Sequence, residues 1–350
     1  MNLLERTIQA IRPIDAKWID AAERHQLDLT KPPGSLGRLE EIANRCAAIR
    51  ETLAITAAHP RIVIFAADHG VCAEGVSAYP QEVTAQMVAN YLRGGAAINA
   101  LARAGDIDLK VVDVGVLAPL AGFDGLISRR VAASTRNFCV EPAMSEAEMI
   151  AALETGIELA TQAAAEGCDL LGFGEMGIGN TTSASAITAA LTGDPVESVV
   201  GRGTGVDDEG VGRKRRAVER ALALHADRLT SATAILQCVG GLEIAAMCGF
   251  CLGAAAHRVP VVTDGFIATA AAAVAVRMCP AVVGYLFAAH QSVEPGHGRL
   301  MATIGQTPLL NLGMRLGEGT GAALAMGIVQ AAVAAFTEMA TFAGAGVSKG

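Results

Sequence analysis

From about residue 60 onward, short apolar runs rich in β-branched residues alternate with longer, alanine-rich stretches. The short runs have the length of buried strands, and the longer stretches have the length of helices. We expect strands at 61–70, 109–116, 168–177, 259–265 and 281–290, and helices at 84–104, 145–166, 181–192 and 210–229. Because strands that alternate with helices form βαβ units, the pattern predicts an α/β protein with a doubly wound, mostly parallel sheet and helices on both faces.

The two ends of the chain depart from this alternation. Residues 1–54 are predicted to form helices, interrupted by the turn "LTKPPGSLGRLEE", in which Ser35 could cap the next helix. Near the other end, "RLGEGTG" precedes an uncharged run over 319–337, for which we predict a helix capped by Thr320.

Polar residues and glycines gather where the predicted strands end. These clusters are Asp68-His69-Gly70, Asp113-Val114-Gly115, Gly174-Glu175, Asp264-Gly265 and His290-Gln291-Ser292. Each could simply form a turn, because Asp and Gly are favoured there. In a doubly wound sheet, however, ligands bind beyond the carboxyl ends of the strands. Their recurrence at one end of the sheet therefore favours a binding site.

The segment "LLGFGEMGIGNTTSASAI" (170–187) combines a strand, a glycine-rich loop and the start of a helix at Asn180, Thr181 or Thr182. Backbone N–H groups in such a loop, together with a helix N-terminus, favour the binding of a phosphate. The glycines also fit a Gly-x-Gly-x-x-Gly dinucleotide fingerprint at 172–177, or an ordinary tight turn. We favour a phosphate cradle, because the fingerprint lies late in the chain and Glu197, at the right distance, ends no recognisable second strand.

Two further segments are candidates for ligand contacts. The stretch 199–222 has a second glycine-rich loop and then a basic helix start, where cations oppose the helix dipole. Of its four consecutive basic residues, we expect Lys214 to meet an anion and the three arginines to be solvated. The stretch 68–98 carries Tyr79, Gln86, Met87 and Tyr91, which suit a flat apolar ligand, although Met87 and Tyr91 could equally be core residues.

Glu318 is a single carboxylate between two glycines at the head of the long apolar run. The helix dipole and free N–H groups favour its ionised form, whereas the apolar neighbours disfavour it. We expect an ionised but poorly solvated carboxylate, which suits a general base. The alternative is a glutamate that interacts only with the helix dipole.

Composition limits the classes of function. The net charge of −8 argues against a nucleic acid or an anionic membrane surface as partner. The eight cysteines include one Cys-x-x-Cys, at Cys248 and Cys251, without a second ligand pair, so we expect buried thiols in a reducing cytosol. The seven histidines show no metal-ligand spacing. Despite a mean hydropathy of +0.40, the long uncharged runs are too rich in Ala, Gly and Thr to suggest a membrane span.

Six motifs, in order along the chain, resemble one enzyme family. They are "KPPGSLGRLE", "ADHGVCAEGVSAYPQEVTAQMV", "GFGEMGIGNTTSASA", "GRGTGVDDEG", "DGFIATAAA" and "MRLGEGTGAALAM". The resemblance is to nicotinate-nucleotide–dimethylbenzimidazole phosphoribosyltransferases, which make α-ribazole phosphate for the lower ligand of cobalamin. It implies a Rossmann-like α/β substrate-binding domain over 55–312, a small helical domain built from 1–54 with 313–350, and a cytoplasmic homodimer.

The resemblance also assigns roles to residues. Glu318 corresponds to a general base that takes a proton from the acceptor. The nucleotide and its phosphate are expected to contact Glu175, Gly177, Gly179, Asn180, Thr181, Gly203, Lys214 and Asp264. The benzimidazole is expected to contact Tyr79, Gln86, Met87 and Leu316. The implied substrates are nicotinate mononucleotide and a benzimidazole base, with neither a metal nor another cofactor. A nucleotide-dependent oxidoreductase and a ligand-binding carrier remain as alternatives.

Overall fold

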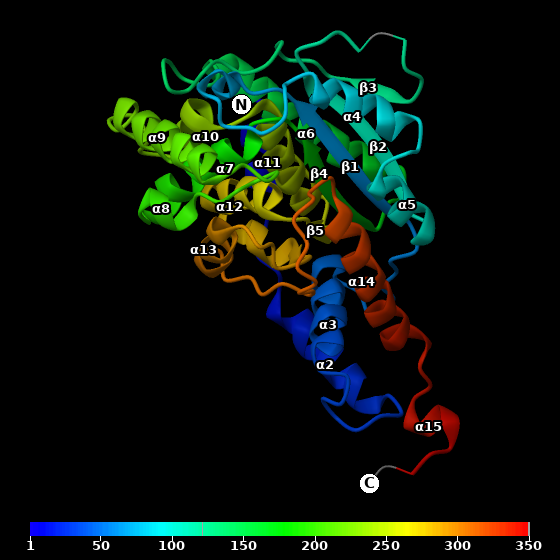
Figure 1. The fold of residues 1–350 in the computed structure, drawn as a ribbon. Helices are drawn as coiled ribbons and strands as arrows, with labels where there is room; N and C mark the ends of the chain where they lie inside the picture. The colour runs from blue at the N-terminus through cyan, green and yellow to red at the C-terminus, as the bar shows by residue number, and fades with distance from the viewer. Residues whose placement is uncertain (121, 349–350) are drawn as a thin grey trace.

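Figure 1 shows the computed structural model of the chain, which describes residues 1–120 and 122–348. Within these ranges, six strands form one sheet in the order β3-β2-β1-β4-β5-β6, and every neighbouring pair is parallel. The strands are β1 (Pro60–Ala67), β2 (Asp108–Gly115), β3 (Leu126–Ser128), β4 (Leu170–Met176), β5 (Val261–Thr263) and β6 (Leu286–Ala288). The predicted parallel α/β sheet is therefore confirmed.

The sequence pattern missed one strand and overestimated another. β3 has only three residues and pairs with β2 at the sheet edge, so it lacks the apolar run of a central strand. The run 281–290 yields strand structure only over β6, because its first part forms the 3₁₀ helix η2 (Pro280–Tyr285). A second 3₁₀ helix, η1 (Gly70–Glu74), follows β1.

Helices fill the connections and both ends of the chain. They are α1 (Leu3–Ala10), α2 (Ala16–Asp28), α3 (Arg38–Arg50), α4 (Val83–Leu92), α5 (Ala97–Ala104), α6 (Glu146–Ala165), α7 (Asn180–Thr192), α8 (Val196–Val199), α9 (Asp208–Leu224), α10 (Ala232–Val239), α11 (Leu242–Ala256), α12 (Phe266–Met278), α13 (Pro295–Thr303), α14 (Thr320–Glu338) and α15 (Phe342–Ala345). The helix predicted over 84–104 is split into α4 and α5, because the chain turns at Gly94, whose φ is 77°.

The core is built mainly from small and branched side chains, with few aromatic rings. On one face of the sheet, α11 packs so closely on α6 that a Cβ at Gly249 would lie 1.9 Å from the Leu153 carbonyl oxygen. Phe250 of α11 meets Phe65 and Phe173, at ring-centroid distances of 5.7 and 6.1 Å. Glycine and alanine therefore let the helices approach the sheet, which explains an aromatic content of only 4%.

The apolar run near the C-terminus forms α14, which packs against α3 and against β4 and β5 on the other face of the sheet (Figure 1). Its 19 residues are long and apolar enough to cross a membrane, but 56% of the apolar window is buried inside the protein. The helix α14 is thus more than half buried, as a core helix is.

The chain order places a switch point between β1 and β4, at the middle of the sheet. From β1 the chain adds strands on one side, and from β4 it adds strands on the other. Loops that leave these two strands diverge and open a crevice beyond their carboxyl ends, where ligands of such sheets bind. The order of the strands therefore predicts that the loops after β1 and β4 form walls of a ligand-binding site.

The two ends of the chain meet beside the sheet. Thr30 donates its backbone N–H to the Ala340 carbonyl over 3.0 Å, and His25 Nε2 lies 2.9 Å from the Phe336 carbonyl oxygen. In contrast, α1 packs on α6 and α11 of the large α/β unit. The division into 55–312 and a domain of 1–54 with 313–350 stays a prediction.

Candidate functional site

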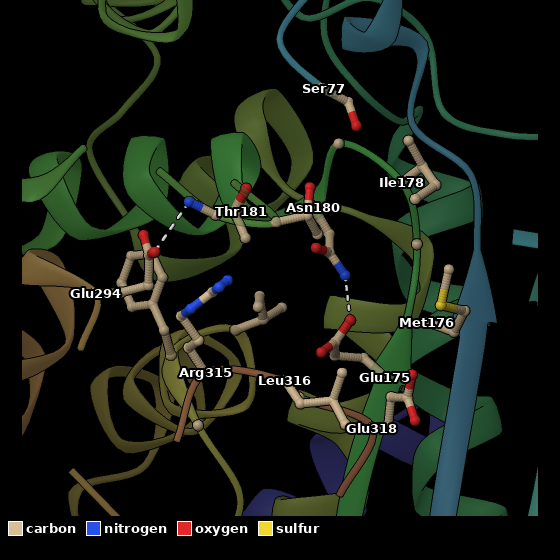
Figure 2. Close-up of a pocket in the computed structure, with 18 of the residues that line it drawn as sticks. Ser77, Glu175, Met176, Ile178, Asn180, Thr181, Glu294, Arg315, Leu316 and Glu318 are labelled. Carbon is tan, nitrogen blue, oxygen red and sulfur yellow. Dashed lines mark hydrogen bonds between the residues drawn. The ribbon is translucent and has the colours of Figure 1, made fainter. Parts of the chain in front are cut away.

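A cavity of about 680 Å³ opens beyond the carboxyl ends of β4, β5 and β6. Its volume lies within the range of about 300–1,000 Å³ that is typical of small-molecule sites. The wall is formed by residues from the segments 76–87, 175–181, 202–204, 214, 264–268, 290–294 and 315–318. Figure 2 shows Glu175 and Glu318 on one side of this space, with Thr181 and Glu294 across from them.

The structure brings together the predicted site residues with one exception. The cavity wall includes Tyr79, Met87, Glu175, Gly177, Gly179, Asn180, Thr181, Gly203, Lys214, Asp264, Leu316 and Glu318. Gln86, expected at the acceptor, is exposed on α4 and is absent from the wall among the described residues. One residue turns a helix by about 100°, so Gln86 and Met87 cannot share a face.

The first two glycines of the dinucleotide-like pattern do not form a phosphate loop. Gly172 and Gly174 lie within β4, and a Cβ at Gly174 would come within 2.1 Å of the Gly319 nitrogen. These glycines allow the strand to contact α14 closely, so the dinucleotide interpretation has no structural support. The loop itself is short: β4 ends at Met176 and α7 begins at Asn180, with Gly179 as N-cap at a φ of 97°.

One buried cation lies beside the N-terminus of α7. Lys214 is fully buried, and its Nζ donates to Thr181 Oγ1 over 2.8 Å. Burial lowers the pKa of Lys214 to about 8, although the nearby Glu294 carboxylate opposes this shift. Gly203 donates its N–H to Glu294 Oε1 over 2.9 Å. A helix N-terminus next to an ammonium group forms an environment suited to an anion such as a phosphate.

Buried carboxyl groups gather on the opposite wall. Asn180 Nδ2 donates to Glu175 Oε2, yet burial raises the pKa of Glu175 to about 8, and the charges of Glu243, Asp264 and Glu318 raise it further. Crowded carboxyl groups in a low-dielectric pocket resist simultaneous ionisation. This wall therefore favours either protons or a cationic ligand.

Glu318 has an unusual backbone. Gly317, Glu318 and Gly319 have φ values of 82°, 62° and 80°, so three successive residues are left-handed. Glycine adopts this region without strain, which explains the Gly-Glu-Gly pattern, whereas the glutamate adopts it at an energetic cost. Strained residues of this kind cluster at functional sites.

The Glu318 carboxyl group is 7% exposed, and its Oε2 has no hydrogen-bond partner in the described chain. Burial raises its pKa; the Tyr91 hydroxyl lowers it and the Asp264 charge raises it. Glu318 lies two residues before the start of α14, and the N-cap of this helix is Gly319, so Glu318 does not cap it. Its burial in the cavity wall favours a role in the cavity over a glutamate that interacts only with the helix dipole.

Asp264, not Thr320, caps α14. Its Oδ2 accepts the Gly319 N–H over 3.0 Å, and its Oδ1 accepts those of Gly321 and Ala322 over 2.7 and 3.1 Å. The expected Thr320 cap is wrong, since Gly319 is the N-cap and the Thr320 hydroxyl donates to the Gly317 carbonyl. A cap supplied from the distant end of β5 leaves no local sequence signal.

Apolar side chains complete the cavity. Tyr79, Met87 and Leu316 belong to the wall, joined by Met176 and Phe266, which the sequence reasoning did not select. Tyr79 and Leu316 are about half exposed, at 51% and 55%, so they lie at the opening. An apolar end of this kind suits an aromatic ring. Tyr91 is buried on α4 next to Glu318, outside the wall.

The polar clusters at the strand ends differ in role. Asp113 is not part of the wall; its Oδ1 accepts the Val116 N–H over 2.8 Å, as a turn residue would. His69 is fully buried, and its Nε2 lies 2.6 Å from Glu243 Oε1. His290 belongs to the wall, whereas burial lowers the pKa of His297 to about 3. Some of these clusters therefore only form turns, as at Asp113, whereas others contribute to the cavity wall, as at His290.

Other wall residues lay outside the sequence-based selection. Arg202, Glu294 and Arg315 contribute charged groups, and Glu294 Oε2 is buried without a hydrogen-bond partner in the ranges described. Glu294 follows the cluster after β6 by two residues, so a wider window at the strand ends would have found it. No group of three or more His, Cys, Asp or Glu residues within 1–120 and 122–348 is arranged to hold a metal ion. All eight cysteines are free, and Cys248 and Cys251 are buried in α11.

Comparison with known proteins places this geometry in context. A model of a phosphoribosyltransferase family matches residues 11–347. The chain is 52% identical to the nicotinate-nucleotide–dimethylbenzimidazole phosphoribosyltransferase of Geobacter metallireducens and 53% identical to that of Chloroflexus aggregans, covering 100% of this chain and 99% of each relative. The crystal structure of CobT from Thermus thermophilus is similar, with a TM-score of 0.91 and 50% identity over 95% of this chain and all of that one.

Proposed function

Because the chain belongs to this phosphoribosyltransferase family, we propose that it transfers the phosphoribosyl group of nicotinate mononucleotide to 5,6-dimethylbenzimidazole. The products are nicotinate and α-ribazole 5′-phosphate, the nucleotide of the cobalamin lower ligand. The observation that carries the proposal is one cavity with a cationic, phosphate-suited wall opposite a buried carboxylate beside an apolar opening.

The chemistry needs a single base. A lone pair on one benzimidazole nitrogen forms a bond to the anomeric carbon, while the bond from that carbon to the pyridinium nitrogen breaks. The electron pair of that bond returns to the ring nitrogen, so the pyridinium becomes an uncharged pyridine ring and departs as nicotinate without needing an acid. The proton on the other benzimidazole nitrogen must then be removed, and in this proposal Glu318 accepts it. Attack from the face opposite the leaving group inverts the anomeric carbon from β to α.

The charges at the two ends of the cavity support different roles for its two walls. The pyridinium and the ribosyl centre of the transition state carry positive charge, which the wall with Glu175, Asp264 and Glu318 would stabilise. Lys214 and the start of α7 suit the phosphate at the other end. A base with a raised pKa holds a proton more readily than an exposed glutamate would, which favours proton removal from a ring N–H.

The proposal extends to the setting of the enzyme. Eight free cysteines, seven of them buried, agree with a reducing cytoplasm. The contacts between α2, α3 and α14 are consistent with a small helical domain made from both chain ends. A homodimer and the preference for dimethylbenzimidazole over other bases rest on the family resemblance. Light scattering would test the first, and competition between acceptor bases the second.

The proposal is tested by incubating the protein with nicotinate mononucleotide, with and without dimethylbenzimidazole, and measuring free nicotinate. The transferase releases nicotinate only when the acceptor is present, in equal amount to α-ribazole phosphate. A carrier would bind ligand and release none, and an oxidoreductase would instead respond to a nicotinamide dinucleotide. Either of these outcomes would refute the proposed reaction.

A further inference from the structure

We propose that Asp264 is a positioning residue that fixes the Glu318 carboxylate by binding the backbone of the turn that carries it, an inference that rests on the proposed role of Glu318 as the base. The sequence-based expectation was a nucleotide contact for Asp264. Its hydrogen bonds point to a different task.

Both carboxylate oxygens of Asp264 are already engaged by the chain. Three backbone N–H groups, from Gly319, Gly321 and Ala322, donate to it over 2.7–3.1 Å. The side chain is 1% exposed. A carboxylate that satisfies three otherwise free N–H groups at a helix N-terminus has little remaining capacity for a substrate hydroxyl.

The turn is held from two further sides. A Cβ at Gly174 would lie 2.4 Å from the carbonyl carbon of Glu318, so the backbone of β4 presses against the peptide that follows the base. The His290 ring contacts the first turn of α14, where a Cβ at Gly321 would lie 2.0 Å from its Cδ2. Of these three contacts, Asp264 is the one that hydrogen-bonds to the backbone of the turn, and hydrogen bonds are directional.

Replacement by asparagine would disturb the clamp without changing the side chain's size. The amide keeps one acceptor oxygen but turns an NH₂ group toward a backbone N–H donor, so at least one of the three hydrogen bonds is lost. The left-handed conformation of Glu318 needs such support, because the surrounding structure must hold it in place. Released, the carboxylate would leave its working geometry.

The same substitution also removes a charge from the surroundings of Glu318. The titratable groups near that carboxyl are Tyr91 on α4, Glu175 on β4, Asp264 after β5, and His290 next to Asp264. The Asp264 charge raises the pKa of Glu318, so Asp264→Asn should lower that pKa. A base with a lower pKa stays ionised to lower pH. In a plot of kcat against pH, the acidic limb therefore moves to lower pH. A buried carboxylate that supports the fold at a distance from Glu318, such as Asp169, should leave the limb unmoved when it is replaced.

The experiment compares Asp264→Asn with Asp169→Asn in the nicotinate-release assay. Asp169 is a matched control: it is 3% exposed and accepts the N–H groups of Ala58 and His59 over 3.0 and 2.8 Å, at the amino end of β4. We expect Asp264→Asn to lower kcat by about 10²-fold with KM for the mononucleotide changed by less than about threefold. Its acidic limb should shift to lower pH, and Asp169→Asn should keep the wild-type kcat and limb.

Hydrogen exchange supplies a second readout that does not depend on catalysis. Amides of 319–322 should exchange faster in Asp264→Asn than in Asp169→Asn. If Asp264→Asn fails to fold, Asp264→Ala is measured with and without formate, which should slow exchange and partly restore kcat by replacing the carboxylate. Wild-type kcat, an unmoved limb or unchanged exchange in Asp264→Asn would overturn the inference. Failure of wild-type protein to release nicotinate would instead refute the proposed function, and the exchange result would still decide the role of Asp264 in the turn.

Discussion

At the scale of single residues, the cavity contains groups whose ionisation is set by burial. Glu175, Glu318 and Lys214 all have pKa values displaced toward their neutral forms, mainly because they are buried. Such groups weaken the folded state at a pH where they must ionise, and they are typical of sites where a ligand supplies the missing charge.

Glu175 should make the stability of the unliganded protein fall as pH rises. Its pKa is raised from 4.5 to about 8 on folding, so its contribution is fully present below pH 4.5 and is lost as pH rises through 8. Glu175→Gln should remove this pH dependence. The unfolding free energy of the variant, relative to that of the wild type, should therefore rise by on the order of 2–4 kcal/mol from pH 5 to pH 9. Urea unfolding at the two pH values measures the gain. Equal slopes in wild type and variant, with the exposed Glu158→Gln as control, would contradict the buried-proton account.

Lys214 should act on the nucleotide more than on turnover. Lys214→Met keeps an apolar stem but removes the cation that lies beside Thr181, so KM for nicotinate mononucleotide should rise about 10–100-fold with a smaller change in kcat. Initial rates at varied nucleotide concentration measure this. Arg216→Met, exposed on the same helix, should leave KM unchanged. If only the KM for the benzimidazole changed, the phosphate would be bound elsewhere.

At this scale the sequence singles out residues whose neighbours in the chain are unusual. Glu318 stands out because two glycines flank it, and those glycines share its left-handed conformation. Asp264 could not be understood in this way, since its partners lie more than 50 positions away and are backbone groups of ordinary residues. The same holds for Glu294, whose partner is a glycine N–H.

At the scale of elements, close contact between β4 and the turn before α14 determines the geometry of the base. Alternating strand and helix patterns predicted β1, β2 and β4 well, because long buried strands have clear apolar runs. They missed β3, which is short and at the edge, and merged α4 with α5, because a glycine pair is a weak break in an alanine-rich stretch. Neither the strand pattern nor the helix pattern of apolar residues predicts which elements contact one another.

Gly174→Ala tests the contact between β4 and the turn. The added methyl group would lie within 2.1–2.6 Å of Glu318 and Gly319 backbone atoms, so the turn must move. We expect a loss of about 1–3 kcal/mol in unfolding free energy and about 10²-fold in kcat, measured by denaturation and by nicotinate release.

Gly327→Ala is the control for that substitution. Gly327 lies within α14, and a Cβ there has nothing within 4 Å in the described chain. This variant should gain about 0.5–1 kcal/mol at unchanged kcat. If Gly174→Ala also kept the wild-type kcat, the contact would not position the base.

At the scale of the whole molecule, the sheet order brings seven separate segments of the chain to one crevice. A switch point between β1 and β4 sends their loops apart, and the segment just before α14 brings Glu318 to the same place. The alternation of strands and helices predicted such a crevice, and the polar strand ends predicted much of its wall. Which strand ends would face the cavity depended on the order of strands in the sheet, which no local pattern contains.

The most direct test of the account is the turnover of Glu318→Gln with nicotinate mononucleotide and dimethylbenzimidazole. The amide keeps the size of the side chain but cannot take the ring proton, so kcat should fall about 10²–10⁴-fold while nucleotide affinity changes little. Asp169→Asn, measured in parallel, should turn over like the wild type. A kcat for Glu318→Gln within a few-fold of the wild-type value would contradict the account, because the cavity would then be working without its base.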